Sequence, residues 1–179
     1  MKYFIAFICT MFLACPCLSQ TPTRTNTEAR DSLRGFVQEF YDWYVPKFWK
    51  RSPKLAVKIA LKQRDYLFRP ELARALGDYS MLRRKGRRTI AGSMHDPFLN
   101  AGEACERYGV GAISSEGSTY RVSIYPICSG LAPGNSVVDA ELARDGKHWV
   151  FVNFSYPGEG DLLTHVREIK EANESPLSN

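Results

Sequence analysis

The sequence lacks the patterns that mark the commonest enzyme and cofactor sites. It contains three histidines, His95, His148 and His165, and no His-Glu-x-x-His, Cys-x-x-Cys or phosphate-loop pattern. It also lacks the Gly-x-Ser-x-Gly turn that exposes a nucleophilic serine. These absences speak against the common zinc, nucleotide-binding and serine enzymes, and we expect neither a cofactor nor a metal ion.

Two groupings of polar residues keep a catalytic or metal-binding alternative open. Asp161, His165 and Glu168 have the spacing of ligands on one helical face, although a helix cap and a solvated face explain them equally simply. Asp42 with His95 or His148 would form an acid–base pair if they met inside a cavity. Asp42 lies off the apolar side of its helix, however, so we predict no catalytic residues.

Long apolar runs are absent beyond the first residues. A positively charged start precedes an uncharged run over residues 3–14, which is shorter than the ~20 apolar residues of a membrane-spanning helix. Cys17 and Ser19 then fit the −3 and −1 positions of a signal cleavage before Gln20. We therefore predict a signal peptide over residues 1–19 and an exported protein, periplasmic or secreted.

A second cleavage site leaves a lipoprotein as the alternative. The segment Phe12-Leu13-Ala14-Cys15 loosely matches a lipoprotein box, and cleavage there would place a lipid on Cys15 and tether the protein to a membrane. The preferred box has leucine where this chain has Phe12 and a small residue where it has Leu13. Simple cleavage before Gln20 is therefore the favoured prediction.

Charge is distributed unevenly along the mature chain. Residues 20–88 carry 17 Lys/Arg against 7 Asp/Glu, whereas residues 89–179 carry 6 against 12. Part of the basic excess is one cluster, Arg83, Arg84, Lys85, Arg87 and Arg88. Such a cluster binds acidic partners or stays solvated, and in an exported protein nucleic acid is the least suitable partner. We interpret it as an exposed loop that is a candidate docking surface.

The first helix of the predicted domain is the element that needs a partner surface. Its apolar positions fall on one side of a helix and are Leu33, Phe36, Val37, Phe40 and Tyr44. We expect this helix over Glu28–Tyr44, after a mobile leader over residues 20–27 and ended by Pro46. Trp43 and Trp49 are interpreted as packing at the edge of the core. The alternative is that they line a pocket and stack on a ligand.

Three more helices are expected from spacing and caps. The first covers Pro53–Gln63, and the second opens at Pro70, where a proline is favourable in the first turn. Asp161 is expected to cap the last helix, whose inward residues are Leu162, Leu163, Val166 and Ile169. A polar tail over residues 173–179 follows, so a single domain spans residues 28–172.

From Cys105 onward the periodicity changes to two, which is typical of strands. Tyr120, Val122 and Ile124 alternate with polar residues, and two hairpins are expected at Glu116-Gly117 and Asp145-Gly146. In the second hairpin, Leu142 is expected to face Trp149 and Ala140 to face Phe151. The strand over His148–Tyr156 is apolar on both sides, so we expect it in the middle of the sheet.

The first hairpin also predicts a disulfide. A two-residue turn at Glu116-Gly117 pairs Ile113 with Tyr120 and, further along the ladder, Cys105 with Cys128. Residues paired in antiparallel strands have Cα atoms about 4.5–5.5 Å apart, within the range of a disulfide. Because an exported protein folds under oxidising conditions, we expect this bond to form.

Helices followed by antiparallel hairpins predict an α+β fold, in which N-terminal helices pack on a curved, cone-like antiparallel sheet with a C-terminal helix. Four segments also resemble a domain-of-unknown-function family of small exported bacterial proteins and lipoproteins. They are Phe40–Tyr44, Pro70–Leu76, Asp96–Ala101 and Gly146–Phe154. That family is similar to the cone fold of nuclear transport factor two, and it supplies no catalytic residues to transfer.

The functional expectation is an exported, non-catalytic binding module. It would use a cavity or a sheet face to bind a partner protein or a small ligand, with Trp43, Trp49 and the basic cluster as speculative contacts. A small cavity enzyme of the isomerase or hydrolase type is one alternative. The other is an inhibitor or immunity protein that docks on an acidic exported toxin through the basic half of the chain.

Overall fold

The computed structural model describes residues 24–50, 53–82, 95–101, 104–129 and 134–174. The helices are α1 (Arg24–Lys50), α2 (Pro53–Gln63), the 3-10 turn η1 (Asp65–Leu67), α3 (Pro70–Leu82) and α4 (Leu162–Glu174). The strands are β1 (Arg107–Glu116), β2 (Thr119–Ile127), β3 (Val138–Asp145), β4 (His148–Tyr156) and β5 (Gly160–Asp161). The predicted signal peptide, the cleavage sites and the basic cluster lie outside the described residues.

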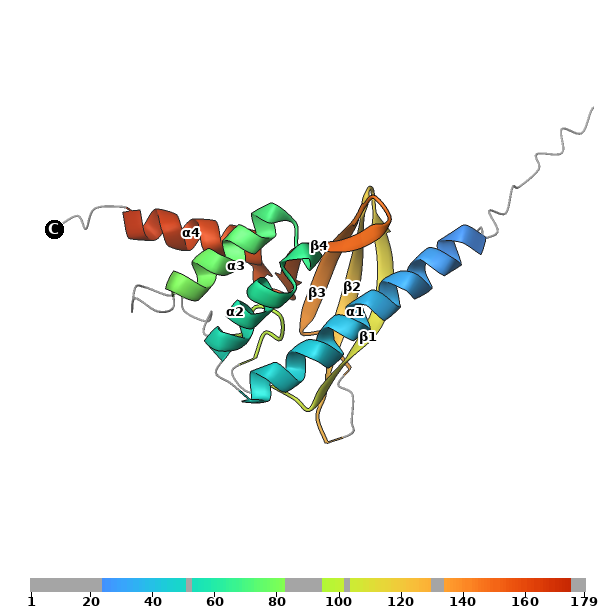
Figure 1. Cartoon of the computed structure of the whole chain (residues 1–179), viewed down its shortest axis with the longest axis horizontal. Coiled ribbons are helices and arrows are strands. Elements are labelled where there is room, and N and C mark those ends of the chain that lie inside the picture. The colour runs from blue at the N-terminus through green and yellow to red at the C-terminus, as the bar shows by residue number, and fades with distance from the viewer. Residues whose placement is uncertain (1–23, 51–52, 83–94, 102–103, 130–133, 175–179) are drawn as a thin grey trace, which may run out of the picture.

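The predicted α+β architecture is confirmed. The five strands form one antiparallel sheet in the order β1-β2-β3-β4-β5, so the sheet is open, with β1 and β5 at its edges. Helix α1 lies across one face of the curved sheet, while α2, α3 and α4 gather beside β4 (Figure 1). The core forms where α1 and this group of helices meet the sheet.

Helix α1 is longer at both ends than the sequence indicated. It starts at Arg24, within the segment assigned to the leader, and it continues through Pro46 to Lys50, so the expectation that Pro46 ends it is wrong. Val45 and Phe48 beyond the expected end are both buried and extend the apolar stripe. Their burial offsets the hydrogen bond that a proline removes from a helix interior.

Helices α2, α3 and α4 follow the sequence closely. The expected range of α2 and the start of α3 at Pro70 are confirmed. Asp161 caps α4 as predicted, because its Oδ1 accepts the backbone N–H of Thr164 at 3.0 Å. Helix α4 extends to Glu174, two residues into the segment assigned to the polar tail.

Both hairpins turn one residue later than expected. Glu116 pairs with Thr119 and Asp145 with His148, so Gly117 and Gly146 are the first residues of their two-residue loops rather than the second. Their φ angles of 62° and 57° lie in the left-handed region that favours glycine. The predicted pairings of Leu142 with Trp149 and of Ala140 with Phe151 are therefore wrong: Leu142 pairs with Phe151, and Ala140 pairs with Phe154 beyond a bulge between Glu141 and Leu142. The predicted pairing of Ile113 with Tyr120 is wrong as well, because Ile113 pairs with Val122.

This shift leaves the predicted faces intact. Between each turn and the first bulge, every pair moves by two positions, and a strand presents the same face every two residues. Val122 and Ile124 are accordingly fully buried, as the alternation predicted. A bulge between Val110 and Ile113 then shifts the pairing of β1 with β2 by one residue, in the part of the ladder that lies away from the turn.

The predicted disulfide between Cys105 and Cys128 is confirmed. It joins the segment before β1 to the segment after β2, with the two Cα atoms 4.8 Å apart. The bulge in β1 contributes to this outcome, because it partly offsets the displaced turn before the ladder reaches the cysteines. The bond therefore closes the open end of the first hairpin.

Side chains of α1 cover part of the outer edge of β1. The Gln38 side-chain amide donates to the Tyr108 carbonyl at 2.8 Å and accepts the Val110 N–H at 3.2 Å. Arg34 also donates to the Val110 carbonyl, at 2.6 Å. A free strand edge is a template for unwanted pairing, so these helix side chains occupy the place of a neighbouring strand.

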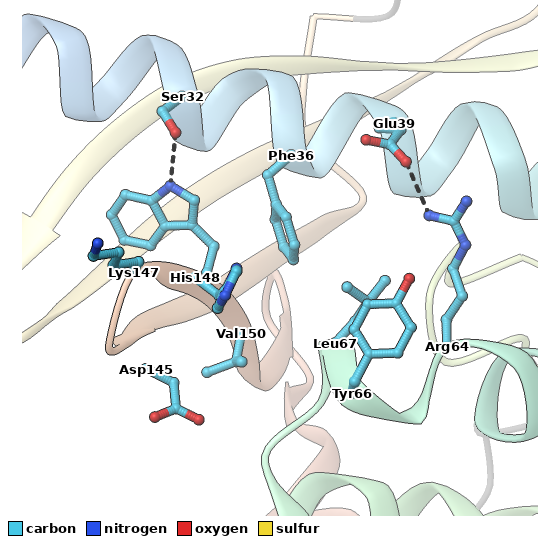
Figure 2. A pocket seen from close by; sticks show the side chains of 11 residues that line it. Ser32, Phe36, Glu39, Arg64, Tyr66, Leu67, Asp145, Lys147, His148 and Val150 are labelled. Atoms are coloured by element: carbon cyan, nitrogen blue, oxygen red, sulfur yellow. Dashed lines mark hydrogen bonds and ion pairs between the residues drawn. The ribbon is translucent and has the colours of Figure 1, made fainter.

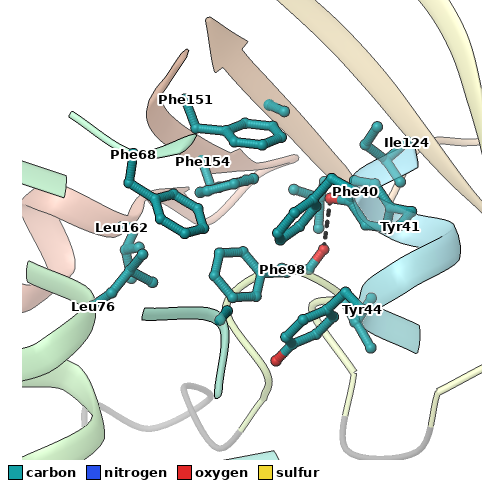
Figure 3. Close-up of a cluster of buried hydrophobic side chains, with 14 of the residues drawn as sticks. Phe40, Tyr41, Tyr44, Phe68, Leu76, Phe98, Ile124, Phe151, Phe154 and Leu162 are labelled. Carbon is teal, nitrogen blue, oxygen red and sulfur yellow. Dashed lines mark hydrogen bonds between the residues drawn. The ribbon is translucent and has the colours of Figure 1, made fainter. Parts of the chain in front are cut away.

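Aromatic rings fill the space between α1, the sheet and the helices beside β4 (Figure 3). The Phe40 ring lies 5.0 Å from the ring of Phe151 and 5.2 Å from that of Phe98, measured between centroids. Phe98 also lies 5.7 Å from Phe68 and 5.1 Å from Phe154. The region where a cone-shaped fold would hold an internal cavity is occupied by these five packed rings.

Candidate functional site

A groove with a volume of about 700 Å³ lies along the outer side of β4. It lies between the middle of α1, the η1 turn and the tip of the β3–β4 hairpin (Figure 2). We call it the β4-edge groove. It is lined by Ser32, Phe36, Glu39, Arg64, Tyr66, Leu67, Asp145, Lys147, His148, Trp149 and Val150.

The strand order places β4 inside the sheet, between β3 and β5, but β5 pairs with only one end of it, and this leaves room for the groove along the rest of its outer side. Beyond β4 the sheet continues only as β5, which pairs with Ser155 and Tyr156, and as an isolated parallel bridge from Phe68 to Phe151. The Arg69 N–H donates to the Phe151 carbonyl at 2.9 Å and fixes that bridge. The edge between the bridge and the hairpin tip faces the groove.

The wall of the groove near the hairpin is built around Trp149. Its indole Nε1 donates to the Ser32 hydroxyl of α1 at 3.2 Å, and the Arg144 guanidinium lies 3.7 Å from its ring centroid. Tyr120 meets the same indole edge-on, at 5.3 Å between ring centroids. These contacts hold Trp149 in one orientation, so this wall is preformed.

The other apolar surfaces come from Phe36 and Tyr66. Phe36 is half-buried, and its ring lies 5.3 Å from that of Phe151. Tyr66 in η1 is 68% exposed, which is unusual for an aromatic side chain of this size. An apolar surface that stays open to solvent in this way is typical of a binding groove.

Charged groups stand at both ends of the groove, and they balance. Arg64 and Glu39 form an ion pair at 3.1 Å near η1, and the Arg64 guanidinium lies 4.7 Å from the Trp43 ring centroid. At the hairpin end, Asp145 and Lys147 are exposed and of opposite sign. The four charged side chains that line the groove therefore balance, and Arg144 beside Trp149 adds a single positive charge, too little to select a polyanion.

The groove contains one histidine and two carboxylates, His148, Glu39 and Asp145. His148 is exposed at the hairpin end, and among the described residues no hydrogen bond joins a histidine to a carboxylate within it. A general base needs a positioned partner within hydrogen-bond reach of the substrate proton. The arrangement is suited to holding a ligand against aromatic walls.

The residues singled out in the sequence occupy other places. Trp43 is half-buried under Lys47 and Arg64, whose charged groups lie 4.3 and 4.7 Å from its ring centroid, so these side chains cover its face. Trp49 is 58% exposed, and its Nε1 donates to the Cys105 carbonyl at 3.2 Å. Neither tryptophan lines the β4-edge groove.

The alternative pairing of Asp42 with His148 and the alternative metal-binding grouping do not assemble. Asp42 is exposed and accepts a hydrogen bond from Gln38 at 2.9 Å, away from the groove that His148 lines. Asp161 is engaged in the helix cap, while the His165 Nε2 lies 2.6 Å from the Glu159 carbonyl oxygen. In the described ranges, no three metal-ligating side chains come together.

A second, much smaller void of about 20 Å³ lies beside Asp96, in a turn held by tyrosines. Tyr44 donates to the Asp96 carboxylate at 2.6 Å, Tyr156 to the Pro97 carbonyl at 3.0 Å and Tyr79 to the His95 carbonyl at 2.6 Å. Burial, followed by the nearby Asp96 charge, raises the pKa of Tyr44 well above its usual range. A void of this size holds at most about one water molecule, which identifies this feature as structural.

Sequence reasoning missed most of the groove. Phe36 was assigned to the core stripe, and the connecting segment around Arg64 and Tyr66 carries no periodic signal. The Asp145-Gly146 hairpin was recognised, but its tip becomes a groove wall only through contact with α1. In the sequence, the one available sign was Tyr66, an aromatic residue in the short segment between two predicted helices.

Comparison with protein-family models, with curated proteins and with solved structures finds no match for this chain. The resemblance of four short segments to the domain-of-unknown-function family of small exported bacterial proteins thus stays a prediction.

Proposed function

We propose that this protein is an exported, non-catalytic binding module that holds a partner protein or a small ligand in the β4-edge groove. The observation that carries the proposal is the contrast between a filled interior and an open, aromatic-lined edge. Five phenylalanine rings occupy the centre of the fold, whereas Phe36, Tyr66 and Trp149 line a groove of about 700 Å³. Ligand-binding clefts commonly have this size and composition.

The proposed export rests on the cysteines and on the N-terminal sequence. The disulfide between Cys105 and Cys128 suits a compartment outside the reducing cytosol, and residues 1–19 have the pattern of a signal peptide. Among the described helices, none is long and apolar enough to cross a membrane. Mass spectrometry of the exported protein tests this part: a start at Gln20 supports simple cleavage, and a lipid-modified start at Cys15 supports the lipoprotein alternative.

A titration tests the binding function directly. The 15N-labelled mature chain would be titrated with a set of small aromatic fragments and with acetylated hexapeptides, while backbone amide shifts are recorded. We expect the largest shifts in α1 around Phe36, in η1 and at the β3–β4 tip. Shifts concentrated on another surface, or no shifts with either probe set, would contradict binding in the groove.

Two exposed side chains provide the matched variants. Tyr66→Ala removes a groove wall, and Met81→Ala removes a comparably exposed apolar side chain from α3, at 68% and 54% exposure. Neither change should alter the fold, because both side chains contact solvent more than protein. Only the first should weaken the shifts, and equal weakening by both would argue against this site.

A further inference from the structure

We infer that the ligand of the β4-edge groove is a peptide segment of a partner protein, bound in extended conformation as an added strand beside Trp149. This inference rests on the proposed function and adds the chemical class of the ligand. It follows from the hydrogen-bond pattern of β4, from the shape of the groove and from its charge.

Alternate residues of β4 direct their backbone N–H and C=O away from β3. In an antiparallel pair, residues alternate between those whose N–H and C=O face the partner strand and those whose groups face away. The Phe151 carbonyl accepts the Arg69 N–H, so the groups of Phe151 face away from β3. Two residues earlier, the N–H and C=O of Trp149 point the same way, into the groove.

The hairpin register supports this assignment independently. Asp145 and His148 close the two-residue loop, and such a closing pair bonds within the hairpin. The following pair, Arg144 with Trp149, therefore belongs to the type whose groups face outward. Trp149 thus presents one donor and one acceptor of the main chain at the sheet edge.

Short segments of the chain already pair with the outer side of β4, and a bound peptide would extend this pairing toward the hairpin tip. Phe68 forms a parallel bridge with Phe151, and β5 pairs with the far end of β4. Before Phe68 the chain turns away from the edge in η1, so the stretch beside Trp149 borders the groove and pairs with no further strand among the described residues, while Trp149 and Val150 themselves are 4% and 5% exposed. The stretch before the bridge runs from His148 to Val150, about 7 Å at 3.3 Å per residue, and suits about three residues of an added strand.

Groove residues lie on both sides of β4, as the alternating side chains of an added strand would require. Trp149 and Phe36 lie on one side of the β4 edge, and Val150 lies on the opposite side of the strand because neighbouring residues face opposite ways. Successive side chains of an added strand would meet these two sides in turn. Strand addition of this kind draws affinity from main-chain bonds and specificity from alternate side-chain pockets.

The near-balance of charges in the groove favours an uncharged backbone over a highly charged one. Glu39 offsets Arg64, and Asp145 offsets Lys147, so the side chains that line the groove have no net charge for a nucleic acid or an anionic lipid surface. A peptide bond is neutral and offers a donor and an acceptor at the spacing that Trp149 presents. We therefore expect a segment with an apolar or aromatic side chain directed toward Phe36.

The test uses the mature chain and an array of acetylated, amidated hexapeptides with alternating apolar and polar residues. The best-binding peptide is then remade with a single N-methyl group at each position in turn, which removes one main-chain donor without removing any side chain. We expect one or two of these positions to weaken binding about tenfold, which is the effect of one lost hydrogen bond with some steric conflict.

Amide hydrogen exchange supplies the second readout. The Trp149 N–H should exchange quickly in the free protein and become protected when the peptide is bound. The Val150 N–H, whose residue pairs with Ala143 inside the sheet, should be protected in both states and serves as the control. Tyr66→Ala should lower the affinity for the peptide at least about tenfold, because it removes a ring that lines the groove, and Met81→Ala should leave the affinity unchanged.

The outcomes separate this inference from the proposed function. If aromatic fragments shift the groove resonances but no hexapeptide does, or if N-methylation never matters and Trp149 stays unprotected, the strand inference fails while groove binding stands. If neither probe set shifts the groove, both fail. Position-dependent N-methyl effects together with protection of Trp149 would support an added strand.

Discussion

Tyr44 donates a hydrogen bond of 2.6 Å to the carboxylate of Asp96, and both side chains are almost completely buried. They are 52 residues apart in the chain, so this bond fixes the end of α1 to the turn before β1. The other carboxylate oxygen of Asp96 accepts the N–H groups of Phe98 and Leu99 at 2.9 and 3.2 Å. The turn then places Phe98 among the aromatic rings of the core.

Tyr44→Phe should destabilise the protein by about 1–3 kcal/mol, because it leaves a buried carboxylate without one of its donors. Tyr41→Phe is the matched control, since Tyr41 donates to a neutral carbonyl, that of Phe98, at 2.8 Å. That change should cost about 1 kcal/mol. Urea denaturation measures both variants, and a smaller loss for Tyr44→Phe than for Tyr41→Phe would refute the special role of the carboxylate.

Phe40→Ala should cost about 3–5 kcal/mol in unfolding free energy, as for other large buried aromatic residues. The side chain is 1% exposed, and its ring contacts those of Phe98 and Phe151. Trp49→Ala, at an exposed position on the same helix, should change stability far less. A loss within about 0.5 kcal/mol for Phe40→Ala would mean that the packed interior is wrongly described.

Gln38→Ala should destabilise β1 more than its partly exposed position suggests. The change removes the donor to the Tyr108 carbonyl and the acceptor of the Val110 N–H, and it uncovers a strand edge. We expect a loss of about 1–3 kcal/mol and faster hydrogen exchange at the Val110 amide. Glu39→Ala, at the neighbouring exposed position, is the control, and unchanged exchange at Val110 would show that Gln38 does not cover this edge.

Removing the disulfide by Cys105→Ser with Cys128→Ser should lower stability by about 3 kcal/mol, the effect of releasing a loop of this size on the chain-entropy model. The cysteines are 23 residues apart in sequence. Thiol labelling of the denatured but unreduced mature protein is the direct check. It should find no free thiol at these two positions, and labelling of both would contradict the bond.

Asp161 should give a stability contribution that depends on pH. Burial alone would raise the pKa of its carboxyl, but hydrogen bonds from Asn153 and from the first turn of α4 outweigh burial and lower the pKa below its ordinary value of 3.8. Because the pKa of Asp161 is lower in the folded protein than in the unfolded chain, its ionised carboxylate stabilises the fold at pH values above the unfolded-chain pKa. This stabilisation is lost as the pH falls through the pKa of the folded protein.

Asp161→Ala should therefore cost about 1 kcal/mol near pH 7, as for other lost helix caps. The difference from the unmodified protein should shrink as the pH is lowered below about 4, near the ordinary carboxyl pKa. Urea denaturation at several pH values measures this difference. A gap that stays constant from pH 7 to pH 2 would show that the ionised cap contributes nothing.

The sequence by itself determined features that depend on neighbours close in the chain. The stripe containing Leu33 and Phe40, the cap at Asp161 and the buried faces of Val122 and Ile124 follow from periods of 3.6 and two residues. The faces remained correct even though both hairpins were displaced, because a shift of two positions preserves alternation. The disulfide followed from the same ladder, with the bulge at Val110 offsetting part of the turn error.

The tertiary structure alone decided the features that depend on contacts between distant segments. Helix α1 continues past Pro46 because Val45 and Phe48 gain burial that no local rule anticipates. The β4-edge groove requires Ser32 to meet Trp149, 117 residues away, and Phe68 to bridge Phe151. Periodicity shows which face of an element is apolar, but the partner of that face is set by how the whole chain packs.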